Sequence, residues 1–500
     1  MHYSGFVIFA SQILSLFTGL VFTLLLTRNM SSDEFGAWSF IFYLIGLFAI
    51  INGLFPFWAT RFVARGKEGA IKTAVSANFI VAVVATFLYL LLVSVVLEVL
   101  HVSSVALVIY LIAALQIVNS YLITVFEACL RAVKPQATGY GLLIEEVVKV
   151  VLAYVIFLGT GQLFLGAIAG IVVGASVQAV FYVWLLKNYL RQRIHWGYLR
   201  EWLKGSAAFF YNAVGSQLVG FVLYLLVLFG GQSALGDYSA AVTFSVIIGY
   251  ASSVAFALYP KMLAQDCPLD VTASFKNMLM FALPMAAVAL TMSASLLTIL
   301  NASYGAASPI LILLTVDALV VLVSQFYTQC LIGTETLDVG GKISLRELVR
   351  SKIFKVFTLS YVQAAIALPA VYYVLTQMAV SGPVQAAMYV VAINIFVHVL
   401  SFGVIYALMH GEFKLVVPWV SVAKYVFAAL VAGVVLFVLP QTTTLTTTFG
   451  KVLLGVGLYV LLLLAIDLDA RKLGKSIARE IVIVFRRKPA ASEAIVGFRK

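Results

Sequence analysis

Residues 28–65 read RNMSSDEFGAWSFIFYLIGLFAIINGLFPFWATRFVAR, and the plan of the whole chain follows from this stretch. It joins a short polar turn, an apolar run long enough to cross a bilayer, and a basic exit. Adding 200 to each number finds a second copy at residues 234–264, ALGDYSAAVTFSVIIGYASSVAFALYPKMLA. Both copies have a glycine turn (Gly36, Gly236), an aromatic residue, a serine, an apolar span and a basic residue (Arg61, Lys261). This repeat predicts two related halves, each opening with a helix before the block.

Composition identifies the broad class of protein. Hydrophobic residues make up 63% of the 500 residues and charged residues only 10%, with a mean hydropathy of +1.08. Soluble domains carry about a quarter charged residues, so this chain has far more apolar surface than a water-soluble core needs. Apolar runs that cross a bilayer must be helical, because lipid offers no partner for unpaired backbone groups. We therefore expect an all-α polytopic membrane protein.

Fourteen apolar runs are candidate transmembrane helices. They cover residues 4–27, 36–60, 73–97, 103–126, 137–159, 162–186, 206–229, 236–260, 275–300, 308–332, 353–376, 384–409, 416–439 and 450–468. With the N-terminus placed inside, 29 of the 32 Lys and Arg residues fall in the inside loops and the C-terminal tail. The positive-inside rule then predicts cytoplasmic N- and C-termini. The net charge of +12 becomes a membrane-surface feature, and no basic folded domain indicates a nucleic-acid partner.

The repeat and the loops predict five segments. Residues 1–186 form an N-terminal six-helix bundle, and 187–205 form a basic cytoplasmic linker whose aromatic residues suit the headgroup layer. Residues 206–410 form a second six-helix bundle, 411–470 hold two additional transmembrane helices, and 471–500 form a basic cytoplasmic tail. An even number of helices per half places both halves the same way up. A pseudo-two-fold axis along the membrane normal would then relate them.

Several short motifs resemble one family of exporters. A first helix closing Leu26-Thr27-Arg28 precedes Phe35-Gly36-Ala37-Trp38-Ser39, the second helix ends Arg61–Gly66, and the eighth ends Leu258–Lys261. With the twelve-plus-two helix plan, these features resemble the polysaccharide and lipid-linked oligosaccharide flippases of the multidrug/oligosaccharidyl-lipid/polysaccharide (MOP) exporter superfamily. The resemblance implies a V-shaped pair of bundles around a central cavity in the plasma membrane. It also implies movement of polyprenyl- or dolichyl-linked sugars from the inner to the outer leaflet. Multidrug exporters share the architecture, so the fold leaves the cargo open.

Charged residues inside the predicted spans are the candidates for ion coupling, since each is costly in hydrocarbon without a partner or water. Glu145 and Lys149 are four apart in helix five, in the favourable order for a helix pair. This spacing favours a Glu145–Lys149 pair and leaves Glu146 as an unpaired candidate proton site. Asp317, midway along helix ten, is a third ion-coupling candidate, with a structural hydrogen bond as the alternative reading. His398 can equally be a packed neutral histidine or a proton carrier.

A pyrophosphate-linked sugar needs cations facing its path. The candidates are Arg28, Arg61, Lys149 and Lys261, with ordinary topology anchoring as the alternative for Arg61 and Lys261. Neutral amides can either line the path of sugar hydroxyls or bridge helices. They are Gln12, Asn52, Asn78, Gln116, Asn119, Asn212, Gln217, Gln325, Gln363 and Asn394.

The sequence favours a flippase that moves lipid-linked oligosaccharide by alternating access, with protons or sodium as possible coupling ions and membrane lipids as its surroundings. An ion-coupled multidrug antiporter is the alternative, and a membrane-bound glycosyltransferase or polymerase a weaker one. No outside loop is large enough for a catalytic domain, and no phosphate-cradling GxxxxGK[ST] motif occurs. No CxxC or His-rich metal spacing occurs either, so we expect no enzyme activity, metal or cofactor.

Overall fold

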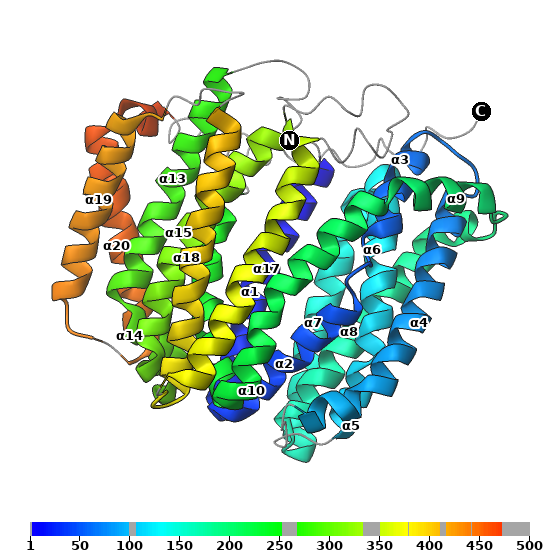
Figure 1. Ribbon diagram of the computed structural model, residues 1–500, viewed down its shortest axis with the longest axis horizontal. Helices are drawn as coiled ribbons and strands as arrows, with labels where there is room; N and C mark the ends of the chain where they lie inside the picture. The colour runs from blue at the N-terminus through cyan, green and yellow to red at the C-terminus, as the bar shows by residue number, and fades with distance from the viewer. Residues whose placement is uncertain are drawn as a thin grey trace, which may run out of the picture.

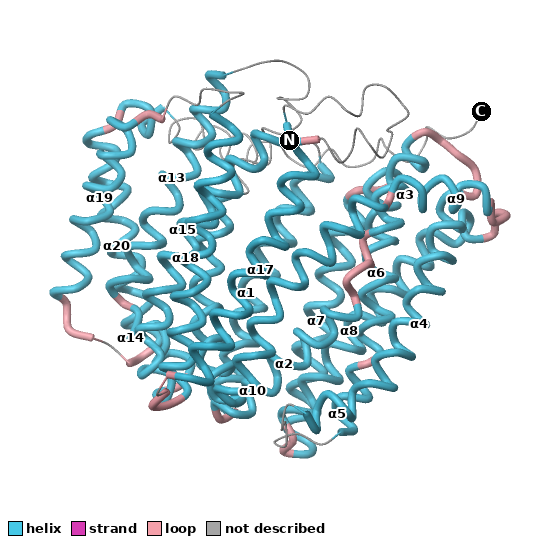
Figure 2. Tube along the Cα trace, viewed as in Figure 1, coloured by secondary structure: helices cyan, strands magenta, loops and turns pink. Residues whose placement is uncertain are grey.

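The structure is a computed structural model of the chain, and it describes residues 3–99, 107–252, 268–333, 351–378, 380–410, 417–441 and 443–472. These residues fold into helices joined by short loops, and no strand occurs among them (Figure 2). Ten helices in the described ranges are long and apolar enough to cross a membrane. The predicted all-α membrane architecture is confirmed.

The first bundle holds eight helices that cover the first six predicted spans. They are α1 (Tyr3–Asn29), α2 (Ser32–Phe48), α3 (Leu54–Ala64), α4 (Ala70–Val99), α5 (Leu107–Ala113), α6 (Leu115–Val133), α7 (Gln136–Thr160) and α8 (Leu163–Leu190). The predicted span 36–60 is not one helix, because the chain turns between Phe48 and Leu54. Asn52 and Gly53, both weak helix formers, lie in this turn. Asn52 donates its side-chain amide to Ser120 Oγ at 3.0 Å, which ties the turn to α6.

The second bundle covers the next six spans, and two further helices follow it. The elements are α10 (Ala207–Gly249), η1 (Tyr250–Ser252), α13 (Pro268–Thr291), α14 (Ser293–Leu300), η2 (Ala302–Ala307), α15 (Ser308–Gly333), α17 (Lys352–Gln377), α18 (Pro383–His410), α19 (Trp419–Val438) and α20 (Leu445–Ile466). In Figure 1 the two bundles lie side by side, with α19 and α20 at the outer edge of the second. Among the described residues, helices therefore lie on part of each of the fourteen predicted spans.

The label α10 covers two predicted spans that meet at Gly231. This glycine has a φ of 81° and a ψ of 174°, which are not helical. Tyr224, before the break, donates its hydroxyl to the carbonyl of Tyr43 at 2.9 Å, and the side chain of Tyr238, after the break, interacts electrostatically with that of Tyr43. Residues seven before and seven after Gly231 thus reach the same level of α2. The two parts of α10 run antiparallel, as the sequence predicts.

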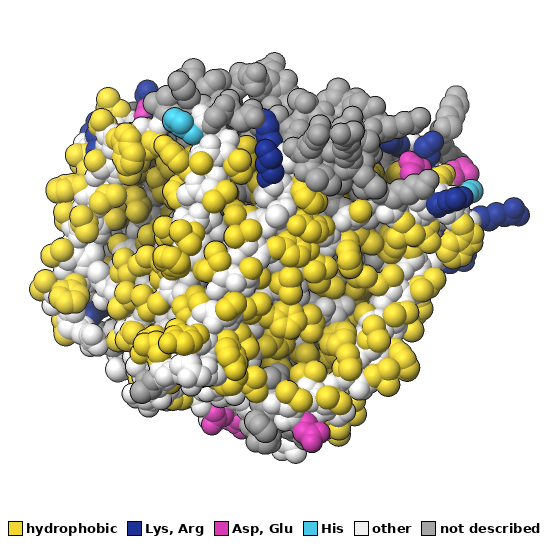
Figure 3. All heavy atoms as spheres, viewed as in Figure 1, with side chains coloured by type: hydrophobic (Ala, Val, Ile, Leu, Met, Phe, Trp, Pro, Cys, Tyr) yellow, Lys and Arg dark blue, Asp and Glu magenta, His cyan; other side chains and the backbone are white. Residues whose placement is uncertain are grey.

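The two ends of the bundles differ in charge. Arg61, Arg65 and Arg131 lie at the end that carries α3 and α6's C-terminus, which we name the basic end. Asp33 and Glu34 lie at the opposite end, named the acidic end. In Figure 3 dark blue side chains gather toward the top and right of the molecule, magenta ones lie among them at the upper right and also at the lower edge, and yellow apolar side chains fill the band between. An apolar belt between two polar ends is the surface that a bilayer requires.

A linker helix crosses the basic end. α8 continues through Lys187 to Leu190, so the start of the predicted linker is helical, and α9 (Trp196–Gly205) follows. The Trp202 ring is fully buried and packs near Phe62, at 5.4 Å between ring centroids. The backbone N–H of His195 donates to Thr73 Oγ1 at 2.9 Å. α9 is therefore fixed to the first bundle, and Figure 1 shows it across the tops of the neighbouring helices.

The repeat is visible where the halves touch at the acidic end. A Cβ added to Gly36 would lie 1.9 Å from the carbonyl oxygen of Gln232, and one added to Gly236 would lie 2.0 Å from that of Ser32. Ser32 and Gln232 are 200 apart, as are Gly36 and Gly236, so the two contacts are symmetry mates. The interpretation of these glycines as turn residues is wrong, since both lie inside helices. They are needed because the helix backbones cross too closely for a side chain.

Hydrogen bonds reinforce these close contacts. Ser32 donates to Asp237 Oδ1 at 2.8 Å, and Ser233 donates to Asp33 Oδ1. We name this set of contacts between residues 32–37 and 232–237 the latch. A capping box between Ser31 and Glu34 starts α2 at Ser32 and so places these side chains. The latch holds the two halves together at the acidic end.

Candidate functional site

The charged cluster of the first bundle lies between α1 and α7. Lys149 Nζ is 2.7 Å from Glu146 Oε1, and the two side chains are 12% and 8% exposed. Ser15 donates to Glu146 Oε1 at 3.0 Å and Thr18 donates to Oε2 at 2.6 Å. The ammonium group also lies 5.3 Å from the ring centre of Phe22 on α1. Every member of this cluster has a partner, so it is a neutral, hydrogen-bonded tie between two helices.

The predicted pairing in helix five is wrong. Lys149 pairs with Glu146, three residues away, rather than with Glu145, four residues away. Both spacings lie on one helix face, and the choice is made by α1, whose Ser15 and Thr18 face Glu146. Glu145 is half-buried and has no hydrogen bond or ion pair within 4 Å among the described residues. The predicted roles are therefore reversed. Glu146 forms the ion pair with Lys149 and the hydrogen bonds to α1, and Glu145 is the carboxyl without a close partner.

The predicted cations are not gathered in one place. Arg28 ends α1 at the acidic end, ten residues or about 15 Å beyond Thr18. Arg61 lies in the last turn of α3 at the basic end, with its guanidinium 4.3 Å from the ring centre of Phe57. Lys149 lies between these levels, and Lys261 lies outside the described residues. Cations thus occur at three depths of the first half.

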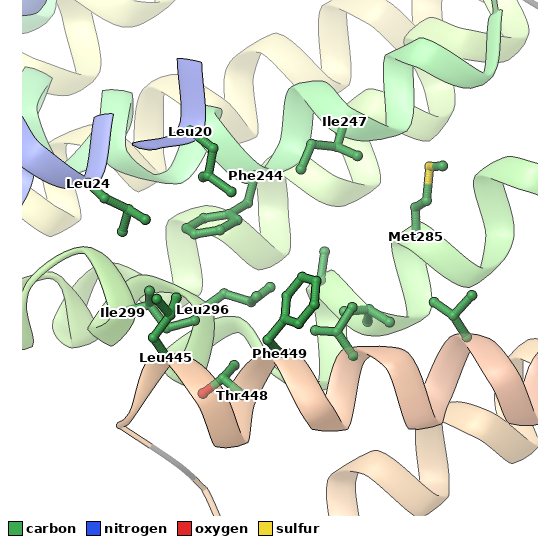
Figure 4. A pocket seen from close by; sticks show the side chains of 14 residues that line it. Leu20, Leu24, Phe244, Ile247, Met285, Leu296, Ile299, Leu445, Thr448 and Phe449 are labelled. Atoms are coloured by element: carbon green, nitrogen blue, oxygen red, sulfur yellow. The ribbon is translucent and has the colours of Figure 1, made fainter. Parts of the chain in front are cut away.

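An apolar pocket of about 220 Å³ lies between α1 of the first bundle, α10, α13 and α14 of the second bundle, and α20 (Figure 4). Leu20 and Leu24 of α1 face Phe244 of α10 and Phe449 of α20 across it. Its other lining residues are Ile247, Met285, Val288, Ala289, Leu296, Ile299, Leu445, Thr448, Val452 and Val456. Thr448 is the single residue with a polar side chain in this lining. The pocket suits a flexible aliphatic group.

A cation adjoins this pocket. Arg28 lies one helical turn beyond Leu24, on the same face of α1. Its Nε donates at 3.2 Å to the carbonyl of Ile299, which is itself a pocket residue. Arg28 is exposed, and its terminal N–H groups make no hydrogen bond among the described residues. An apolar pocket with a guanidinium at its edge fits an amphiphile that has an anionic head and an aliphatic tail.

A polar pocket of about 390 Å³ lies inside the second bundle, between α10, α15, α17 and α18. Its polar lining consists of Asn212, Ser324, Gln325, Thr328, Ser360, Gln363 and His398. Behind it, His398 Nδ1 lies 2.7 Å from Asp317 Oδ1. The sequence singled out both residues but gave no reason to join them, because they are 81 positions apart.

The neutral amides divide between the two halves. In the first half they bridge helices: Asn78 donates to the carbonyl of Tyr121 at 2.6 Å, and Asn119 donates to that of Val172 at 3.0 Å. In the second half Asn212, Gln325 and Gln363 line the polar pocket, and Gln363 also donates to Ser401 Oγ of α18 at 2.9 Å. Both readings of these amides are therefore found in the same chain.

Comparison with known proteins assigns the family. A family model described as "Polysaccharide biosynthesis protein" matches residues 3–264, which is more than half of the chain. The chain belongs to this family. In a sequence search of curated proteins, no protein matches it. The resemblance found in the sequence is thus confirmed at the level of the family.

Solved structures share the fold at low sequence identity. The lipid II flippase MurJ in an inward closed conformation superposes with a TM-score of 0.68 at 13% identity, covering 95% of this chain and 100% of that one. An inward-facing multidrug resistance MATE family transporter of the MOP superfamily gives 0.56 at 14% identity, covering 81% of this chain and 96% of that one. A MATE structure in complex with MaL6 gives 0.52 at 14% identity, covering 81% and 94%. The chain has the fold of these membrane transporters.

Proposed function

We propose that this protein is a flippase that moves a lipid-linked oligosaccharide, carried on a polyprenyl or dolichyl pyrophosphate, between membrane leaflets by alternating access. The observation that carries the proposal is the apolar pocket with Arg28 at its edge. An aliphatic chain fills such a pocket, and the guanidinium binds the phosphate that joins chain and sugar. Membership of a polysaccharide biosynthesis family supports a sugar-bearing cargo.

The extent of the fold also supports a flippase. The MurJ structure covers 95% of this chain, whereas the MATE transporters cover 81%. α20, one of the two helices that follow the second bundle, supplies one wall of the apolar pocket. A helix beyond the two six-span bundles therefore takes part in the pocket that suits a lipid.

The orientation and the five segments belong to the same proposal. The basic end faces the cytoplasm of the cell whose plasma membrane holds the protein, with both termini on that side. Residues 1–186 and 206–410 are the two moving bundles, 187–205 the linker, 411–470 the lipid-binding appendage and 471–500 the cytoplasmic tail. Arg61 and Lys261 bind the phosphates at the cytoplasmic end, and Arg28 binds them at the opposite end before release. Lys149 stabilises the middle of the first bundle. Transport, not catalysis, is the activity assigned.

Reconstitution tests the proposal directly. Purified protein in liposomes should move a fluorescent polyprenyl-pyrophosphate oligosaccharide between leaflets. It should not transport the same oligosaccharide when the lipid has been removed. Arg28→Ala should slow the movement at least tenfold, because one charge-assisted phosphate contact is worth about 1.5–3 kcal/mol. Lys451→Ala, which removes another cation from the acidic end, is the matched control and should keep the parent's rate.

Two results would contradict the proposal. Movement of an organic cation but of no lipid-linked sugar would favour the multidrug antiporter. Equal rates for Arg28→Ala and Lys451→Ala would remove the phosphate contact from the mechanism.

A further inference from the structure

The polar pocket of the second bundle runs from the basic end to the middle of the helices. Thr328 lies five residues, about 8 Å, from the end of α15 at Gly333, and Ser360 lies in the first third of α17. His398 lies twelve residues, about 18 Å, from the end of α18 at His410. The lining between these levels includes neutral amides and hydroxyls such as those of Gln325 and Gln363, together with the apolar side chains of Val321, Val356, Leu359 and Ile405. The polar groups offer hydrogen-bond partners to water, and the pocket reaches the middle of the apolar belt from one side.

A pair of titratable groups closes the inner end of this pocket. His398 Nδ1 is 2.7 Å from Asp317 Oδ1, and the two side chains are 22% and 14% exposed. His398 lines the pocket, whereas Asp317 lies behind it on α15. With Nδ1 occupied by the carboxylate, Nε2 is the ring atom without a partner among the described residues. The imidazole therefore stands between the pocket and the carboxylate.

The surroundings leave this pair to balance its own charge. On α10 the titratable group near Asp317 is Tyr238. Its side chain interacts electrostatically with Asp317 and with Tyr43 of α2. α17 contributes the neutral Gln363, whose amide donates to Ser401 Oγ of α18 at 2.9 Å. No Lys or Arg in the described ranges forms an ion pair with Asp317. The pair thus carries one negative charge when His398 is neutral, and no net charge when a proton has bound.

The cluster of the first bundle lacks this freedom. Glu146 has Lys149 as a fixed counter-ion and accepts from two hydroxyls, so it is neutralised without a proton. Removing a net charge from the apolar belt is favourable, because hydrocarbon does not solvate ions. A change in protonation therefore alters the energy of the α15–α18 contact much more than that of the α1–α7 contact.

We infer that the His398–Asp317 pair is a proton-binding site, reached from the basic end through the polar pocket, and that its occupancy drives the proposed transport. A proton from pocket water binds the lone pair of His398 Nε2, while the Nδ1–H of His398 keeps donating its hydrogen bond to the Asp317 carboxylate. The resulting imidazolium–carboxylate pair is neutral and lets α15 and α18 pack closely. Loss of the proton restores the negative charge and weakens that contact. The inference rests on the proposed function for its cargo, but proton binding is measurable without it.

The first experiment imposes a pH step across proteoliposomes and follows movement of the lipid-linked sugar. The parent should move it several-fold faster with the step than without. His398→Gln and Asp317→Asn should lose the acceleration, each variant being compared with its own rate without the step. Asp469→Asn, the same change at an exposed carboxylate, is the matched control and should behave like the parent. If the pH step accelerates both site variants as it does the parent, the inference is overturned. It is also overturned if Glu145→Gln is the one variant that loses the acceleration, or if the rate depends on sodium rather than on the pH step.

The second experiment needs no cargo. Infrared difference spectra between high and low pH should contain imidazole bands that disappear in His398→Gln and shift in Asp317→Asn. Spectra of the two variants identical to the parent's would overturn the inference, even if the parent moves no lipid-linked sugar. A parent that binds the proton but moves no such sugar would instead contradict the proposed function alone.

Discussion

Substituting Gly36 by alanine should loosen the acidic end of the molecule. The new Cβ would lie 1.9 Å from the carbonyl oxygen of Gln232, and 2.7 Å from its carbonyl carbon. These are backbone atoms of a facing helix, so relief requires α2 and α10 to separate by more than about 1 Å, given contact distances of roughly 3.5 Å. Overpacking of this kind costs about 1–3 kcal/mol. Since 1.4 kcal/mol is tenfold in an equilibrium constant, the closed arrangement should lose about fivefold to a little over a hundredfold in population.

Spin labels placed on α2 and α10 near the acidic end measure this change as a distance distribution. Gly36→Ala should shift the distribution to longer distances and lower the melting temperature. Gly46→Ala is the matched control, because it lies in the same helix and its added Cβ meets nothing within 4 Å. Gly236→Ala should reproduce the effect, with Ser32 O at 2.0 Å. The double substitution should cost less than the sum, because both act on one contact. If Gly36→Ala and Gly46→Ala give the same distances and melting temperature, the latch does not hold the halves together.

Three further predictions follow from the charged residues and the topology. Glu146→Gln should lower the folded yield, because breaking a buried pair costs about 3–5 kcal/mol, whereas Glu145→Gln should leave it unchanged; size-exclusion profiles of the two variants decide between them. Arg61→Ala together with Lys261→Ala should slow movement of the pyrophosphate-linked sugar without lowering protein level, and full activity of the double variant would leave Arg61 and Lys261 as topology anchors only. A cysteine at Ser381 should react with an impermeant thiol reagent in intact cells, and one at Gly197 should react only after permeabilisation; labelling of Gly197→Cys in intact cells would reverse the orientation.

The sequence predicted the order of the apolar crossings because a bilayer makes a simple demand on them. Each crossing needs a long apolar run, and charged loops then alternate between the ends. Breaks within a crossing were missed. The turn at Asn52 and Gly53 interrupts an apolar run without adding a charge, so hydropathy does not register it. Asn52 is held by Ser120 of another helix, a contact that sequence spacing does not contain.

The sequence named the charged residues inside the spans but not their pairings. Spacing placed Glu145, Glu146 and Lys149 on one helix, yet the neighbour that faces them decides which carboxylate takes the ammonium group. Ser15 and Thr18 lie more than 120 positions away and carry no signal of their own. His398 and Asp317 were likewise named separately. Of the long-range contacts described above, the latch alone joins positions that the 200-residue repeat relates to each other, such as Gly36 with Gly236 and Asp33 with Ser233.

The symmetry of the latch bears on how such a chain can arise. Ser32 meets Gly236 as Gln232 meets Gly36, so each half offers the other the same surface. An isologous contact of this kind is what two copies of one shorter chain make when they dimerise about a two-fold axis. A six-helix ancestor would have needed no reversal in the membrane to pair with itself, because an even number of crossings keeps both copies the same way up. Gene duplication and fusion through the α9 linker would then preserve an interface that already existed. Later substitutions could give one half the Glu146–Lys149 ion pair and the other half the His398–Asp317 pair.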